Sequence, residues 1–273
     1  MNEADFIQAL RGFSSLIGDD SAVVPTPGGG DLLFTTDFTI ENVHFKRSAP
    51  ARHVGYQAVA RSLSDIAAMG GQPLYCLIAI ALAPWTTARW LDGFYRGARR
   101  ALGGCRLAGG DVSHARDFIA NVTVVGSVGR GKALLRSGAR PGDRIYVSGK
   151  LGGWHHKKKI VPRLDLGRKL VGRASACMDI SDGLALDLFR LCAASGVAAQ
   201  LDTVPLLPRA TEKQALHDGE DYELLYTVPS GRRAPGFPIG RIIDGSPSIT
   251  LRGERIRPGG YDHFQQLGRK ARV

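Results

Sequence analysis

The chain has 273 residues, of which 44% are hydrophobic and 22% charged, and its formal net charge is +11. This composition is typical of a globular protein of one large domain or two of ordinary size. No apolar run approaches the roughly 20 residues that cross a bilayer, so a membrane span is not expected. The first residues also lack the basic-then-apolar order of a secretory signal, which predicts a cytoplasmic location.

The positive charge raises the possibility of a nucleic-acid partner, because Lys and Arg displace counterions from phosphates. The basic residues are scattered, however, and the densest runs are HHKKK at 155–159 and GRKAR at 268–272. Aromatic residues do not alternate with these runs as they do in single-strand binders. We therefore interpret the runs as a solvated loop and tail, and expect no nucleic-acid partner.

Four cysteines are far apart in the sequence, without a CxxC pair or a nearby group of histidines. This spacing favours reduced thiols in the core over a zinc site or a disulfide framework. His155 and His156 are adjacent, and adjacent imidazoles with lysines beside them are poorly suited to chelating one ion. An exposed connection is the preferred interpretation of that segment.

The first half of the chain alternates strand-like and helix-like segments. Strands are predicted at 31–38 and 118–129, which are rich in apolar and β-branched residues and bounded by glycine. A helix is predicted at 53–70, followed by a buried strand at 74–84. The segment 86–102 begins with a threonine cap signal and is predicted to be a helix.

A Gly-, Pro- and charge-rich stretch at 136–153 predicts a domain boundary near residue 140, giving domains 1–140 and 141–273. Strands and helices interleave in both halves, but the strands are not uniformly apolar. We therefore predict an α+β fold and not a doubly wound parallel sheet. The elements expected after the boundary are strands at 144–149 and 177–180, a capped helix at 181–196, and strands at 221–229 and 238–244.

The segment GSVGRGKA at 126–133 nearly matches the phosphate-binding sequence GxxxxGK[ST]. Ala133 stands where the motif requires a hydroxyl that binds magnesium, and Gly and Pro follow where a helix should begin. A phosphate-binding loop of this type is therefore not expected.

Acidic residues recur beside glycines or at the ends of predicted strands, and they provide a stronger signal. Each group alone is weak, because Asp182 would serve equally well as a helix cap and Asp-Gly often marks a turn. The groups could meet around a divalent cation and a polyphosphate, and if they do meet a metal is required, because carboxylates that converge without a cation repel one another. The groups lie at 18–20, 35–37, 64–65, 109–111, 179–183 and 219–221.

The order of these groups and their neighbours resembles the thiamine-monophosphate kinase family, over nearly the whole chain. The matching segments are IGDDSAV (17–23), TTDFTIENVHF (35–45), ARSLSDIAAMGGQP (60–73), AGGDVS (108–113), GRGKALLRSGARPGDRIYVSG (129–149), MDISDGL (178–184), HDGEDYELLYTVP (217–229) and GYDHF (260–264).

The resemblance implies the two-domain fold of aminoimidazole ribonucleotide synthetase, with the N-terminal halves of two subunits pairing into a β-barrel across a homodimer. It implies transfer of the γ-phosphoryl group of ATP to thiamine monophosphate, giving thiamine diphosphate, with Mg²⁺ and without a phosphate-binding loop. Because the acceptor phosphate is already ionised near neutral pH, we expect direct in-line attack with no phospho-enzyme and no catalytic base.

Carried over by position, the resemblance implies three groups of site residues. The metal ligands would be Asp20, Thr35, Thr36, Asp37, Asp65, Asp111, Asp179 and Asp182. The ATP contacts would be Gly110, Asp111, Arg136 and Ser181. Thiamine phosphate would meet His44, Glu220 and Tyr261, although a lone His is commonly an ordinary surface or core residue, and an aromatic near the C-terminus commonly closes a core.

The segment 150–167 is shorter than the family pattern, which predicts a shortened C-terminal domain and an altered outer wall of the thiamine pocket. Relatives on the same fold are the nearest alternatives. Selenophosphate synthetase would need a reactive Cys or selenocysteine in an N-terminal loop, and the hydrogenase maturation protein a C-terminal Cys; both features are absent here. Aminoimidazole ribonucleotide synthetase and a non-catalytic nucleotide- or nucleic-acid-binding protein remain the alternatives.

Overall fold

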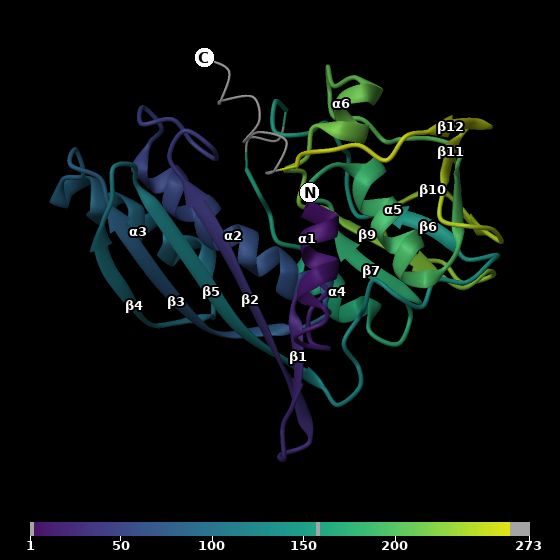
Figure 1. Cartoon of the computed structure of the whole chain (residues 1–273), viewed down its shortest axis with the longest axis horizontal. Helices are drawn as coiled ribbons and strands as arrows, with labels where there is room; N and C mark the ends of the chain where they lie inside the picture. Colours follow the sequence, from purple (N-terminus) through teal and green to yellow (C-terminus); the bar gives the residue numbers. More distant parts are fainter. Residues whose placement is uncertain (1–2, 157–158, 263–273) are drawn as a thin grey trace.

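The computed structural model describes residues 3–156 and 159–262, which form two β-sheets with helices packed on them. Figure 1 shows the N-terminal sheet with α2 and α3 in one half and the C-terminal sheet with α5 and α6 in the other. Among the described residues, no helix has both the length and the apolar character that crossing a bilayer requires. The α+β prediction is confirmed, since both sheets are mixed.

The N-terminal sheet has five strands in the order β1-β2-β5-β3-β4, antiparallel except for the parallel pair β3 and β4. Its strands are β1 (Ala22–Pro25), β2 (Gly30–Ile40), β3 (Gln72–Leu82), β4 (Arg106–His114) and β5 (Ile119–Gly129). The helices of this half are α1 (Glu3–Leu10), α2 (Ala51–Ala68) and α3 (Ala88–Leu102).

Successive side chains of each strand point to opposite faces of this sheet, and one of the two faces is buried. Leu33 on β2, Ile78 on β3, and Val122 and Val124 on β5 are buried in one core cluster with residues of α2 and α3. Within 3–156 and 159–262, no helix covers the opposite face, and every residue of β4 is exposed. The strands and helices predicted in this half are confirmed, but β4 was not predicted, because its Gly- and polar-rich sequence is typical of a loop.

The C-terminal sheet has seven strands in the order β12-β11-β8-β10-β6-β9-β7, antiparallel except for β8 and β11. They are β6 (Arg144–Val147), β7 (Ala176–Asp179), β8 (Ala198–Leu201), β9 (Leu224–Val228), β10 (Phe237–Ile243), β11 (Ile249–Leu251) and β12 (Glu254–Ile256). The helices are α4 (Leu164–Leu170), α5 (Leu184–Ser195) and α6 (Glu212–His217).

The start of α5 differs from the expected cap. Gly183 is the N-cap residue and supplies no side-chain hydrogen bond, whereas the side chain of Asp182 accepts from Arg190. Asp182 therefore does not cap this helix. The C-terminal cap is Gly196 in the left-handed conformation, where a residue without a Cβ is least strained.

The two sheets are joined by close packing of α4 on α2. A Cβ on Gly167 would overlap the backbone carbonyl of Ala67, so glycine allows the two helices to touch. Ala67 also belongs to a core cluster with Tyr146 and Tyr226 of the second sheet. The predicted boundary near residue 140 falls between β5 and β6, the last strand of one sheet and the first of the other, and it stays a prediction.

Candidate active site

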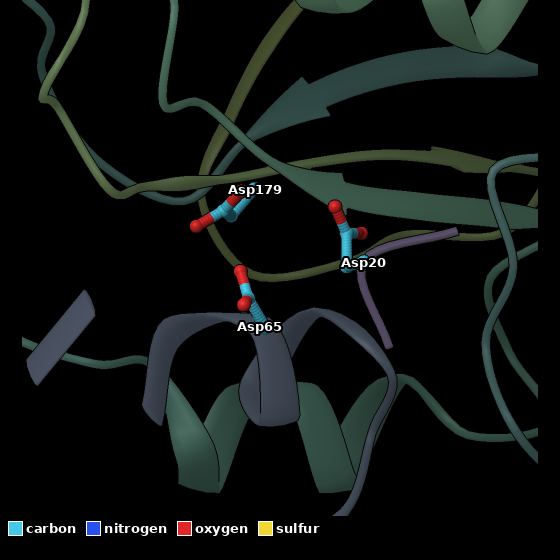
Figure 2. Close-up of side chains that lie close together, drawn as sticks. All are labelled: Asp20, Asp65 and Asp179. Atoms are coloured by element: carbon cyan, nitrogen blue, oxygen red, sulfur yellow. The ribbon is translucent and has the colours of Figure 1, made fainter. Parts of the chain in front are cut away.

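Three aspartates from distant parts of the sequence meet where the two sheets adjoin (Figure 2). Asp20 lies in the loop before β1, Asp65 in the last turn of α2, and Asp179 at the end of β7. Each offers a carboxylate oxygen within 4.8 Å of the others. The fold thus brings three of the predicted metal ligands together.

Asp37 belongs to the same electrostatic group. It lies on the buried face of β2, where strand alternation also places Thr35 and Thr39, and its Oδ2 has no hydrogen-bond partner. Burial raises the pKa of Asp37, and burial followed by repulsion from Asp37 raises the pKa of Asp65 well above its usual value. These carboxylates destabilise one another when all are ionised.

Hydroxyl groups orient two members of the cluster. Thr35 Oγ1 donates to Asp65 Oδ2, and Ser64 Oγ donates to Asp179 Oδ2 over 2.6 Å. Burial, and then the charge of Asp20, raises the pKa of Asp179 well above its ordinary range. Each hydroxyl donates a hydrogen bond to one carboxylate oxygen. Because a hydroxyl is neutral, it does not offset the negative charge of the cluster.

The donor set fits a hard divalent cation. Its members are carboxylate and hydroxyl oxygens, the ligands that Mg²⁺ prefers, and Oδ2 of both Asp20 and Asp37 is buried without a hydrogen-bond partner. Unpaired buried carboxylate oxygens are costly unless something positive faces them. The residues present therefore fit magnesium.

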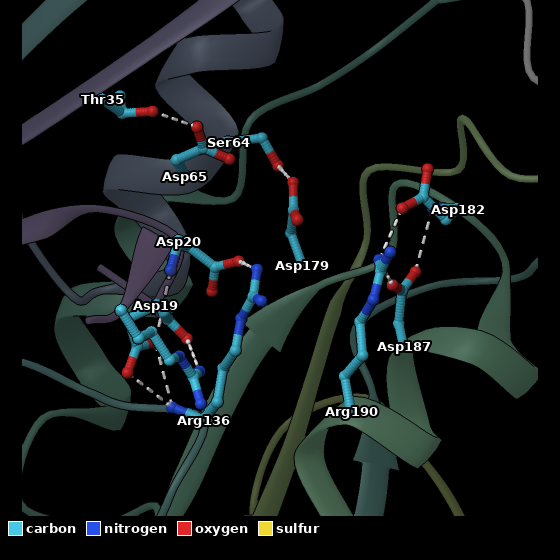
Figure 3. Close-up of polar contacts among 12 residues, drawn as sticks. Asp19, Asp20, Thr35, Ser64, Asp65, Arg136, Asp179, Asp182, Asp187 and Arg190 are labelled. Atoms are coloured by element: carbon cyan, nitrogen blue, oxygen red, sulfur yellow. Dashed lines mark hydrogen bonds and ion pairs between the residues drawn. The ribbon is translucent and has the colours of Figure 1, made fainter. Parts of the chain in front are cut away.

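Arg136 borders the cluster from the segment before β6 (Figure 3). Its Nη2 donates to Asp20 Oδ1 over 2.5 Å, and its backbone N–H donates to Asp19 Oδ1 over 3.0 Å. Burial and then the charge of Asp20 raise the pKa of Asp19 to about 7. Arg136 Nε is buried without a partner, so this guanidinium has a donor left for an anionic ligand.

A second acidic pair lies at the start of α5 (Figure 3). Arg190 Nη1 donates to Asp182 over 2.5 Å and to the buried Asp187 over 2.9 Å. Asp187 also accepts from the backbone N–H of Asp182, and burial raises its pKa to about 7. Asp182 is therefore ion-paired here, beside the acidic cluster but outside its three-carboxylate core.

A cavity of about 330 Å³ contains two of the predicted substrate residues, His44 and Glu220. Arg61 of α2 forms its base: the buried guanidinium donates to Glu220 over 2.5 Å and to Thr39 over 3.0 Å. His44 Nδ1 accepts from the N–H of Ile40, which leaves Nε2 to carry the proton. The wall includes the ring of Trp154.

The cavity and the acidic cluster are neighbours along two elements. On α2, Arg61 and Asp65 are one helical turn apart, and on the buried face of β2, Thr39 and Asp37 are two residues apart. Both steps correspond to about 6 Å along the element. A molecule held in the cavity can therefore extend a phosphate to the carboxylates.

Several predicted site residues lie apart from this centre. Thr36 lies on the uncovered face of the sheet, where its hydroxyl donates to Asn121 over 2.9 Å. Gly110 and Asp111 lie on the exposed edge strand β4, at the opposite edge of the sheet from β1. Tyr261 does not line the cavity with His44 and Glu220, and its backbone N–H donates to the carbonyl of Asp182.

Ser181 lies between the two centres. Its carbonyl accepts from the N–H of Glu220 over 2.6 Å, which ties the segment after Asp179 to the cavity wall. Glu220 and Tyr222 both have positive φ, so this connection bends sharply. The backbone therefore links the metal-binding segment to the substrate-binding segment.

Sequence reasoning assigned no role to Arg61 or Trp154, and it included Ser64 and Asp19 only as members of the acidic groups at 64–65 and 18–20. Arg61 and Ser64 lie within a helix whose apolar spacing indicates packing, and nothing in that spacing separates a site residue from a core residue. Arg61 lies within the apolar pattern of this helix, which was a signal, because a buried arginine requires a carboxylate partner. Asp19 is adjacent to Asp20 and was visible as part of one acidic pair.

Comparisons with known proteins identify the family of this chain. The model of AIR synthase related protein, N-terminal domain, matches residues 18–128. The chain is 34% identical to the thiamine-monophosphate kinase of Aquifex aeolicus, across 92% of this chain and 94% of that protein. It is 33% identical to the thiamine-monophosphate kinase of Bacillus subtilis, across 91% and 93%. The chain belongs to the thiamine-monophosphate kinase family.

Solved structures extend the similarity to three dimensions. The structure described as AaThiL complexed with AMPPCP and TMP aligns with a TM-score of 0.90 at 30% identity, covering 96% of this chain and 97% of that one. The prediction that the segment 150–167 is shortened stays a prediction. Membership of the thiamine-monophosphate kinase family therefore rests on both sequence and fold.

Proposed function

We propose that this member of the thiamine-monophosphate kinase family transfers the γ-phosphoryl group of ATP to thiamine monophosphate, giving thiamine diphosphate and ADP. The observation that carries the proposal is the convergence of Asp20, Asp65 and Asp179 next to the cavity that holds His44 and Glu220. Family membership and a relative solved with AMPPCP and TMP support the same conclusion.

Asp20, Asp37, Asp65 and Asp179, with Thr35, would hold Mg²⁺. Bound magnesium supplies positive charge that neutralises the phosphate oxygens during transfer. Ser64 orients Asp179, and Arg136 presents a guanidinium that can pair with a phosphate. Asp111, Asp182, Thr36, Gly110 and Ser181 stay predictions as further metal or ATP contacts.

The acceptor needs no activation by a base. A phosphate monoester has a second pKa near about 6, so its oxygens are already ionised at neutral pH. The task of the protein is to position that phosphate in line with the γ-phosphorus, while fixed charges stabilise the transition state. We therefore infer direct transfer without a phospho-enzyme.

The cavity suits the organic part of thiamine monophosphate, which contains a positively charged thiazolium ring. Glu220 offers a carboxylate held in place by Arg61, and Trp154 offers an aromatic face that attracts cations. The phosphate of the same molecule would extend towards Asp37 and Asp65. Tyr261 stays a prediction as a ring contact.

One assay tests the proposal directly. The purified chain is incubated with ATP, Mg²⁺ and thiamine monophosphate, and thiamine diphosphate is measured by fluorescence after oxidation. We expect product only when all three are present. Product from aminoimidazole ribonucleotide precursors alone, or ATP binding without turnover of any phosphate acceptor, would favour the alternative enzyme or the non-catalytic protein.

Trp154 provides a test of the cavity. It is 55% exposed, while Trp85 and Trp90 pack against the hydrophobic core, so ligand-induced quenching of tryptophan fluorescence reports mainly on Trp154. We expect Trp154→Ala to raise the KM for thiamine monophosphate about tenfold, from loss of a cation–π contact of roughly 1–2 kcal/mol. The KM for ATP should stay within twofold.

Trp154→Phe is the matched control, because it keeps an aromatic face and should recover most of the affinity. Equal changes in both KM values would contradict a specific role of Trp154 in binding the thiamine rings.

We also propose that two copies pair through the uncovered face of the N-terminal sheet to form the barrel. That face presents large apolar side chains on two strands. They are Phe34 and Phe38 on β2, and Tyr75 and Leu77 on β3. Large apolar side chains gathered on one exposed sheet face are typical of a protein–protein interface. Pairing would also cover Thr36 and the exposed strand that carries Asp111.

We expect Leu77→Asp to convert a dimer into a monomer, because a carboxylate in an apolar interface is strongly unfavourable. Light scattering coupled to size-exclusion chromatography measures the mass. Val161→Asp is the control, since Val161 is also exposed but lies outside the sheet. A monomeric wild-type chain at micromolar concentration would contradict the pairing.

A further inference from the structure

A second cavity, of about 560 Å³, lies between the outer surfaces of α2 and α3, and its lining is strongly basic. Four cationic side chains line it: Arg52 of α2, Arg96 and Arg100 of α3, and Lys159. No carboxylate is among its lining residues. The acidic cluster and its cavity use none of these four cations, so they have no role in the function proposed above.

Close helix packing explains why these charges converge. A Cβ on Gly97 of α3 would overlap the carbonyl of Arg52, and a Cβ on Gly55 of α2 would overlap the carbonyl of Phe94. The two glycines let the helices approach backbone to backbone, which brings like charges from both helices to one place. Repulsion among these cations is unfavourable, and a bound anion would relieve it.

Few anions within the protein compensate this charge. Among the residues that the structure describes, the ion pair at the cavity is Arg96 Nε with Asp92 Oδ2, at 2.8 Å on the same helix. Lys159 Nζ lies 4.5 Å from the centre of the Tyr56 ring, a contact that positions its charge without neutralising it. Arg52 and Arg100 are exposed, and neither forms an ion pair with a carboxylate of the described residues.

The cavity adjoins the proposed substrate cavity, because His53 lines both. Burial, and then the charge of Arg61, lowers the pKa of His53, which favours the neutral imidazole between the two cavities. In the substrate cavity the charge of Arg61 is paired with Glu220, whereas the second cavity is lined by four cations and no carboxylate. The second cavity is therefore a distinct place for a multiply charged anion.

We propose that this basic cavity is a second ligand site, which binds a molecule carrying a linked diphosphate group. Arg96 and Arg100 lie one turn apart on α3 and offer forked donors to adjacent phosphates, while Arg52 and Lys159 approach from the other side. Thiamine diphosphate and a nucleoside diphosphate both present this group. Occupation of the site would place a phosphorylated compound at the outer side of the substrate cavity.

Pyrophosphate in the presence of excess EDTA isolates this site, because without a divalent cation the acidic cluster repels phosphate. We expect isothermal titration calorimetry to detect binding to the wild-type chain. The double substitution R96Q/R100Q should weaken that binding about tenfold or more, since it removes two charge-assisted contacts. The matched control is Arg99→Gln, which removes the same charge from an exposed position on α3 that does not line the cavity.

Three results would overturn the proposal: no pyrophosphate binding at millimolar concentration, an equal loss in Arg99→Gln, or full affinity in R96Q/R100Q. Circular dichroism of each variant shows that the fold is kept. Thiamine diphosphate and ADP serve as the other two probes. Equal affinity for all three assigns the site to the diphosphate group alone, and tighter binding of one identifies the rest of the ligand. Because the measurement needs neither Mg²⁺ nor turnover, its failure is distinct from failure of the kinase assignment.

Discussion

Asp65→Asn is expected to lower kcat by about 100- to 1000-fold, the range seen when one preorganised electrostatic contact to a transition state is removed. The same substitution should raise the melting temperature of the magnesium-free protein. Asp65 faces Asp20, Asp37 and Asp179, and its ionised form is unfavourable there. A neutral amide of nearly equal size removes that repulsion.

Activity and stability therefore change in opposite directions, which separates a metal-binding role from a structural one. The melting temperature is measured with EDTA and again with Mg²⁺, and the gain on adding Mg²⁺ should be smaller in the variant. Asp165→Asn is the control, because Asp165 is an exposed carboxylate in the first turn of α4. Loss of both activity and metal-free stability in Asp65→Asn would refute the metal site.

The second large effect concerns pH. Burial raises the pKa of Asp19 and of Asp187 to about 7, and raises that of Asp65 and Asp179 well above the usual value. Unfolding returns these groups to a pKa near 4, so the folded protein binds more protons between the two values. Without Mg²⁺, this contribution to stability is fully present below about pH 4 and is lost as the pH rises through 7.

Magnesium should oppose this loss. A divalent cation binds the ionised carboxylates, so its stabilising effect should grow from pH 6 to pH 8. Differential scanning calorimetry at pH 5, 6, 7 and 8, with EDTA or with Mg²⁺, measures both trends. Without Mg²⁺, the melting temperature of the wild type should fall relative to that of Asp65→Asn as the pH rises from 5 to 8. The opposite trend would contradict the raised pKa values.

The sequence predicted β2, α2, β3, α3 and β5, because these segments have clear apolar spacing or glycine boundaries. It also identified the acidic residues, but the prediction that they converge rested on the family resemblance. Ser64 and Asp179 are 115 residues apart and form a hydrogen bond. No local pattern encodes that contact, because it depends on how α2 of one sheet packs against β7 of the other.

Two features could not be predicted for physical reasons. Strand β4 is exposed on both faces in the single chain, so it lacks the alternation that identifies strands. The side chains of Thr35 and Thr36 lie on opposite faces of β2, one bonded to Asp65 and the other to Asn121. The sequence motif assigns both threonines to the site. Only the orientation of the strand shows which of the two side chains faces it.

The contact between Gly167 and Ala67 has a consequence for motion. Where two backbones touch with no side chain between them, hinge bending would force main-chain atoms together. Asp65 lies half a turn before Ala67 on the same helix, so it is next to this close helix contact. We therefore expect this helix contact to set the distance between Asp65 of the first half and Asp179 of the second.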